Sequence, residues 1–326
     1  MKFQSVYDKY ENIYGGMFSI FEAFEVRRRI PDSYSFELLD ILLFGWNYMV
    51  SEAGKGSKSA SIATLYLAYQ RNKEENVKYL LNGSQIKNEN FRSSCVDLSS
   101  SYMQFATNGD TGFDVLIELG GGCGHNLIRN FHELKDRLRE NTHFINAEYS
   151  PTGRKLSDKL FEKYEMSENA FSIEFDYNDS GKSFESLESY IKGKDVIIYS
   201  ASSLEQIPFI DKSLFETLER LASLSKTFTI AFCEPIAWQF PRMMPWPVLN
   251  NSQEMTYQIG LNQNLYSSVQ DWVNWSDSGI FIHTVCPSIY FNGYHISGIK
   301  VQTCRDLKSF IWTSASKKNI TTESGD

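Results

Sequence analysis

The stretch VLIELGGGCGHN, at residues 115–126, decides how the rest of this chain can fold. It begins with an apolar run typical of a buried strand, has four glycines within five residues, and leads into NLIRNFHELKDRL, which has helical periodicity. Because glycine lacks a Cβ atom, its backbone can turn at positive φ and approach a ligand closely. The stretch predicts a strand, a loop for a nucleotide-like ligand and a helix; the alternative is a tight turn that binds nothing.

Composition sets the class of protein. Of the 326 residues, 42% are hydrophobic and 22% are charged, which is typical of a folded globular chain. The formal net charge of -8 argues against a partner such as duplex DNA or transfer RNA, bound by a broad basic face. We expect a small or cationic substrate and no nucleic acid.

Strand and helix patterns alternate after the turn residues NGDT at 108–111. We predict a mostly parallel sheet covered by helices on both faces, with ligands outside the carboxyl ends of its strands. The expected strands are 113–119, 143–148, 171–175, 195–200 and 227–233, followed by closing, partly antiparallel strands at 280–291, 296–303 and 309–313. The expected helices are 125–140, 154–164, 184–191 and 207–224.

Two regions lie outside this alternation. Residues 1–110 have helical patterns, with an almost wholly apolar segment at 36–50, and we expect an N-terminal helical cap there. Residues 235–277, rich in proline and aromatic residues, are expected to be an irregular insertion in the domain at 111–326. Trp238, Trp246, Trp272 and Trp275 are candidates to line a pocket, although tryptophan more often packs in a core.

The spacing of Glu118, Gly120, Gly122 and Gly124 resembles the ExGxGxG motif of class I methyltransferases, which use S-adenosylmethionine. The resemblance implies a doubly wound, Rossmann-like sheet of seven strands, with S-adenosyl-L-methionine as the cofactor. At later strand ends, it implies that Glu148 holds the ribose hydroxyls and that Asp176 and Tyr177 contact the adenine. It also implies that the segment Ser200–Ser203, with Ser200 as its cofactor contact, lies beside the reactive methyl group.

Alternatives exist for these assignments. A dinucleotide oxidoreductase would need the fingerprint GxGxxG, but no glycine stands three residues after Gly122. Glu148 could instead be a solvated acid at a strand end, and Asp176 a turn-forming residue in the sequence DYND.

Glu205 and Glu234 follow the fourth and fifth expected strands. Because both stand on the ligand side of the sheet, they are candidate catalytic residues that jointly hold an amine or guanidinium. We expect methyl transfer to a small metabolite or peptide side chain, and favour a basic nitrogen such as that of arginine. The alternatives are O-methylation of a sugar or natural product, and a non-catalytic sensor or scaffold that binds the cofactor.

Five cysteines without a CxxC spacing and five histidines without a metal-binding spacing predict a reducing compartment and no bound metal. The amino-terminal sequence lacks the pattern of a signal peptide, and the densest apolar run is too short to span a bilayer. We therefore expect a cytoplasmic protein without a membrane partner.

Overall fold

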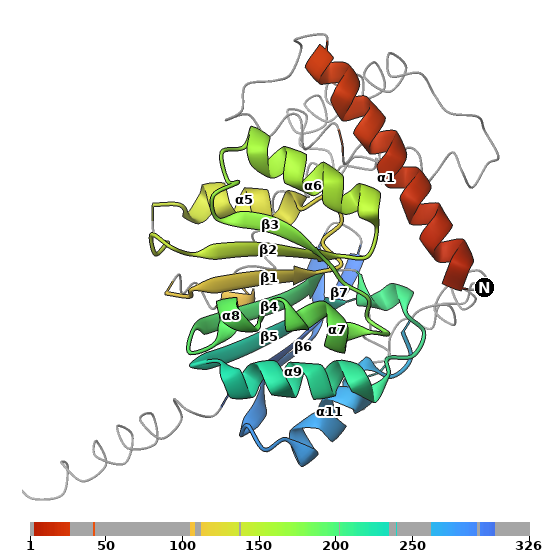
Figure 1. Ribbon diagram of the computed structural model, residues 1–326. Coiled ribbons are helices and arrows are strands. Elements are labelled where there is room, and N and C mark those ends of the chain that lie inside the picture. Colours follow the sequence, from red (N-terminus) through yellow and green to blue (C-terminus); the bar gives the residue numbers. More distant parts are fainter. Residues whose placement is uncertain are drawn as a thin grey trace, which may run out of the picture.

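The computed structural model describes residues 3–26, 42, 105–107, 112–136, 138–201, 203–234, 239, 262–291 and 294–303. Within these ranges the strands form one seven-stranded sheet in the order β3-β2-β1-β4-β5-β7-β6 (Figure 1). Its strands are β1 (Val115–Leu119), β2 (His143–Glu148), β3 (Ala170–Glu174), β4 (Asp195–Ala201), β5 (Thr227–Glu234), β6 (Ile280–Phe291) and β7 (Tyr294–Thr303).

The first five strands pair in parallel, and β7 pairs antiparallel with both β5 and β6. Of the described strands, only β7 therefore runs against the others. This is the doubly wound, mostly parallel seven-stranded sheet that the sequence predicts, and its order is that of the Rossmann-like methyltransferase fold.

Helices cover both faces of the sheet, and each face has its own hydrophobic core. On one face, α5 (His125–Leu134) and α6 (Pro151–Lys163) pack against the sheet, and α1 (Phe3–Val26) packs outside α6 (Figure 1). The opposite face carries α9 (Lys212–Leu224), flanked by α7 (Ser180–Glu185), α8 (Glu188–Ile191) and α11 (Leu265–Trp275).

The start of α6 is fixed by its local sequence. Ser150 caps the helix by accepting the N–H of Gly153 at 2.9 Å, and Pro151 occupies the first turn, where its missing N–H costs nothing. The chain therefore turns sharply from the end of β2 into α6. This turn places Glu148 beside the helix N-terminus.

The expectation of an irregular chain over residues 235–277 is wrong at α11. Leu265, Val269 and Trp272 recur at helical spacing and are fully buried, so a short amphipathic face is enough to hold this helix. Trp272 packs against Phe215 and donates its indole N–H to Glu219 at 2.9 Å. It is a core residue and not a pocket wall.

Several predicted boundaries also differ. The helix expected at 125–140 ends at Leu134, and the one at 184–191 is divided between α7 and α8. A 3-10 turn, η1 (Leu204–Gln206), precedes α9, so the helix expected from 207 begins at Lys212. Trp238, Trp246, the strand expected at 309–313 and most of the cap at 1–110 lie outside the described residues.

Candidate nucleotide-binding site

The order of the strands locates a ligand crevice. The chain passes from β1 outward through β2 and β3, and then returns to place β4 on the other side of β1 (Figure 1). In open parallel sheets, ligands bind outside the carboxyl ends of the strands at such a reversal. The glycine loop follows β1 at this edge, and the turn containing Ser203 follows β4.

The glycine loop has the backbone that its sequence predicts. Gly120, Gly122 and Gly124 have φ values of 65°, 60° and 73°, a region that strongly favours glycine. A Cβ atom on Gly120 would lie 2.6 Å from the Cβ of Ser203, and one on Gly124 would collide with Ser157. Any larger residue would therefore strain the backbone and displace neighbouring side chains.

Both backbone groups of Gly122 are held by side chains of β2. Its N–H donates to Glu148 Oε2 at 2.9 Å, and its carbonyl accepts from Asn146 Nδ2, also at 2.9 Å. Residues 146 and 148 stand two apart on one strand and so share a face. Sequence reasoning missed Asn146, for which the available signal was an amide within an apolar strand.

Glu148 is not the solvated acid of the alternative interpretation, since its exposed fraction is 6%. Its Oε1 accepts the N–H of Ser150 at 2.8 Å, so each carboxylate oxygen already receives one backbone hydrogen bond. Burial raises the pKa of Glu148, and the two backbone donors oppose this shift. A carboxylate oxygen has two lone pairs, so each oxygen of Glu148 has the capacity to accept one further hydrogen bond.

Glu118 is turned under the glycine loop, with an exposed fraction of 1%. Its Oε1 accepts from Asn126 Nδ2 at 2.6 Å, and burial raises its pKa to about 8. The hydroxyl of Tyr199 also interacts with this carboxyl and lowers its pKa. Within the described structure, the geometry leaves Oε2 of Glu118 and Oδ1 of Asn146, its register neighbour on β2, as buried acceptors without a close hydrogen-bond donor. A donor, either a proton on Glu118 or an amine, is the chemical complement of this pair of acceptors.

Asp176 and Tyr177 follow β3. Asp176 Oδ1 accepts the backbone N–H of Asn178 at 2.8 Å, which is the turn-forming role considered as an alternative. The hydroxyl of Tyr177 lies 2.8 Å from Ser203 Oγ and 3.3 Å from the position that a Gly120 Cβ would take. Tyr177 thus spans from β3 to the glycine loop, while contact of either residue with adenine stays a prediction.

After β4, Ser203 contacts the loop more directly than Ser200 does. Ser200 is fully buried beside Leu119 in the sheet. Ser203 Oγ lies 2.8 Å from the carbonyl oxygen of Leu119, to which it donates. The Ser200 side chain therefore has no exposed surface in this conformation, and its contact with a cofactor stays a prediction.

Of the two expected catalytic acids, Glu234 has a described side chain and Glu205 does not. Glu234 is fully buried at the end of β5, and its Oε1 accepts the N–H groups of Ser203 and Leu204 at 3.4 and 3.3 Å. Glu205 is the next residue in the same turn, η1, but its side chain is outside the described structure. Glu234 thus holds the backbone that carries Glu205, and joint binding of a cation stays a prediction.

Two aromatic side chains near Glu148 were not predicted. Tyr149, the next residue, has an exposed fraction of 47%, so its ring has a face available for stacking on a flat ligand. Tyr14 of α1 is buried, and its hydroxyl would lie 2.5 Å from a Cβ on Gly122. Tyr14 was not evident from sequence, because it stands more than a hundred residues before the loop, and the exposure of Tyr149 has no signal in the sequence.

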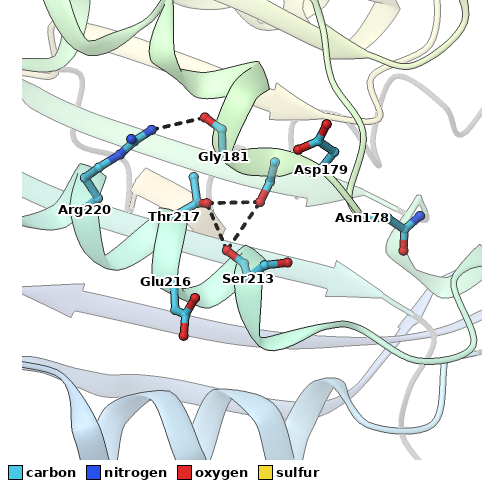
Figure 2. A pocket seen from close by; sticks show the side chains of 8 residues that line it. Asn178, Asp179, Gly181, Ser213, Glu216, Thr217 and Arg220 are labelled. Carbon is cyan, nitrogen blue, oxygen red and sulfur yellow. Dashed lines mark hydrogen bonds between the residues drawn. The ribbon is translucent and has the colours of Figure 1, made fainter.

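A polar hollow of about 340 Å³ lies elsewhere, between α7 and α9 (Figure 2). Its hydroxyl groups bond to one another and to backbone: Thr217 Oγ1 lies 3.2 Å from Ser180 Oγ and donates to the Ser213 carbonyl at 2.9 Å. No residue of the predicted site lines it. The lining residues are Asn178, Asp179, Ser180, Gly181, Ser213, Glu216, Thr217 and Arg220.

Comparisons with protein-family models and with curated proteins found no match. Among solved structures, the chain is similar to geranyl diphosphate C-methyltransferase from Streptomyces coelicolor, at 9% identity over 68% of this chain and 86% of that one, with a TM-score of 0.43. A methyltransferase from Podospora anserina gives 17% identity over 63% and 77%, with a TM-score of 0.44. An O-methyltransferase family protein from Burkholderia thailandensis gives 16% over 66% and 57%, with a TM-score of 0.42.

Among the described helices, none has both the length and the apolar character that crossing a bilayer requires.

Proposed function

We propose that this chain binds S-adenosyl-L-methionine at the glycine loop and transfers its methyl group to a small metabolite or peptide side chain. The main support for the proposal is that the glycine loop and the Glu148 carboxylate lie side by side, joined by the Gly122 N–H. Three left-handed glycines and a buried carboxylate meet at the reversal point of a doubly wound sheet. There, a backbone can approach a ligand and an acid can bind hydroxyl groups in a desolvated site.

The other loop contacts support the same ligand. Glu148 retains lone pairs for ribose hydroxyls, Tyr149 offers an exposed ring, and the Glu118–Asn146 pair offers acceptors beneath the loop. When bound, the sulfonium supplies an already activated methyl group, so the protein has mainly to orient the acceptor and manage its proton.

For the acceptor, we propose a basic nitrogen such as that of arginine, contacted by Glu205. Glu234 would fix the turn that contains Glu205, because the Glu234 carboxylate accepts the backbone N–H groups of Ser203 and Leu204, the two residues before Glu205. A carboxylate at this position would orient a cationic group and offset its repulsion from the sulfonium. In the alternative, O-methylation of a sugar or natural product, the acceptor is neutral, so Glu205 would have no cation to hold.

Incubation with isotopically labelled methyl donor and fractionated lysate, followed by mass spectrometry, tests the catalytic part of the proposal. A labelled product, present with the protein and absent from a matched Glu148→Ala sample, is the expected result. Cofactor binding without labelling of any fraction would favour the sensor or scaffold function.

A further inference from the structure

Helix α1 covers the glycine loop through one side chain. The ring of Tyr14 is seated between two glycines of different segments: a Cβ on Gly122 would lie 2.5 Å from its hydroxyl, and a Cβ on Gly153 would lie 3.1 Å from its Cδ2. The same Gly153 Cβ would lie 3.1 Å from Glu148 Cγ. Tyr14 therefore occupies the space directly beside the carboxylate and the loop.

Burial shows how complete this cover is. Tyr14 is 4% exposed and Glu148 is 6% exposed, and Gly122 is also buried. Burial, followed by the nearby charge of Glu148, raises the pKa of the Tyr14 phenol well above its ordinary value. A ligand that contacts both Glu148 and Gly122 thus has to enter space that Tyr14 fills.

A second contact, away from the loop, holds α1 in place. One turn before Tyr14, the Oε1 of Glu11 accepts from Ser150 Oγ at 2.8 Å and from the N–H of Thr152 at 3.1 Å, and so binds the N-terminus of α6. One turn after Tyr14, the ammonium of Lys155 lies 4.6 Å from the centre of the Phe18 ring. The docking of α1 can therefore be weakened by a substitution that leaves Tyr14, Glu148 and the loop residues themselves unchanged.

We propose that α1 is a lid whose Tyr14 competes with the ligand for the space beside Gly122 and Glu148, so that α1 must move outward before the ligand binds. This inference rests on the proposed function for the identity of the ligand, but not for the cover itself. If only a fraction of molecules is open, the apparent dissociation constant is the intrinsic one divided by that fraction. Loosening α1 by any means must then tighten binding.

The test compares wild type with Tyr14→Ala, which empties the space, and Glu11→Ala, which only loosens the docking; Tyr14→Phe is the matched control that keeps the ring. Hydrogen exchange of a peptide covering residues 120–124, without ligand, should be faster in both alanine variants than in wild type. Titration with S-adenosylhomocysteine should give a dissociation constant about tenfold lower for Tyr14→Ala and modestly lower for Glu11→Ala. Thermal unfolding confirms that each variant is folded. If Tyr14→Ala does not fold, Glu11→Ala alone still tests the inference.

Unchanged exchange in the loop of both variants would show that α1 does not cover it. Faster exchange with weaker binding would also overturn the inference, because α1 would then close over the ligand and retain it. If exchange is faster but neither wild type nor any variant binds S-adenosylhomocysteine, α1 does cover the loop and the proposed function is refuted.

Discussion

Glu148 accepts the N–H of Gly122 through its Oε2 at 2.9 Å, and this bond ties the end of β2 to the loop that follows β1. The same carboxylate accepts the N–H of Ser150 through Oε1, so it also fixes the entry to α6. One acid thus sets the geometry of both helix N-termini at the candidate site.

Replacing Glu148 by alanine should weaken binding of S-adenosylhomocysteine by about 1.5–3 kcal/mol, as expected for lost hydrogen bonds to a charged group. Isothermal titration calorimetry measures this change. Glu174→Ala is the control, because Glu174 pairs with Glu148 in the register of β2 and β3 but its side chain is 75% exposed. Equal loss of affinity in the two variants would remove Glu148 from the site.

Two glycine substitutions separate backbone strain from crowding. Gly193 has a φ of 70° and open space around its missing Cβ, so Gly193→Ala should lower the free energy of unfolding by only ~1–2 kcal/mol. Gly124, at 73°, faces Ser157 and Phe161, so Gly124→Ala should cost roughly 1–3 kcal/mol more. Urea denaturation measures both; equal losses would mean that the helix start can relax around the added methyl group.

Glu118 should make stability depend on pH. Burial raises its pKa from 4.5 to about 8, so between these values the folded state keeps a proton that the unfolded state releases. Its contribution to stability is therefore greatest at low pH and is lost as pH rises from about 4.5 to 8. The free energy of unfolding of Glu118→Gln relative to wild type should rise by about 2–4 kcal/mol across this window.

Denaturant unfolding at several pH values measures the difference between Glu118→Gln and wild type. A difference that stays constant across this range would show that Glu118 is ionised throughout. Glu162→Gln serves as the control, because Glu162 is exposed on α6 and its side-chain contact is with Lys159.

The acids after β4 and β5 should differ in their response to conservative change. Glu205→Gln should lower kcat by about 100-fold if it contacts the acceptor, with little change in cofactor affinity. Glu234→Gln should stay within a few-fold of wild type, because the glutamine oxygen can still accept from Ser203 and Leu204, whereas Glu234→Ala should lose activity. Severe loss in Glu234→Gln would instead support the hypothesis that both acids hold the cation.

The parallel sheet was predictable because its strands are short apolar runs bounded by turn residues. For β2 and β6 the predicted and observed bounds coincide. β1, β4, β5 and β7 differ by one or two residues at one end, and β3 is shifted by one residue at both ends. Helix α11 was missed because only three buried positions, Leu265, Val269 and Trp272, define its face, and prolines upstream dominated the pattern.

For the site, the loop and Glu148 were evident because glycine spacing and a strand-final acid are local signals. Asn146 and Tyr14 were not, since each acts through a contact with a residue distant in sequence. The burial of Glu234 was also beyond sequence reasoning: a strand-final acid looks the same whether it faces a ligand or a backbone turn.

Calorimetric titration of the purified chain with S-adenosylhomocysteine and, separately, with NADH tests whether the glycine loop binds S-adenosyl-L-methionine. We expect saturable one-to-one binding of S-adenosylhomocysteine and no measurable binding of NADH. Saturable binding of NADH, with none of S-adenosylhomocysteine, would contradict this expectation.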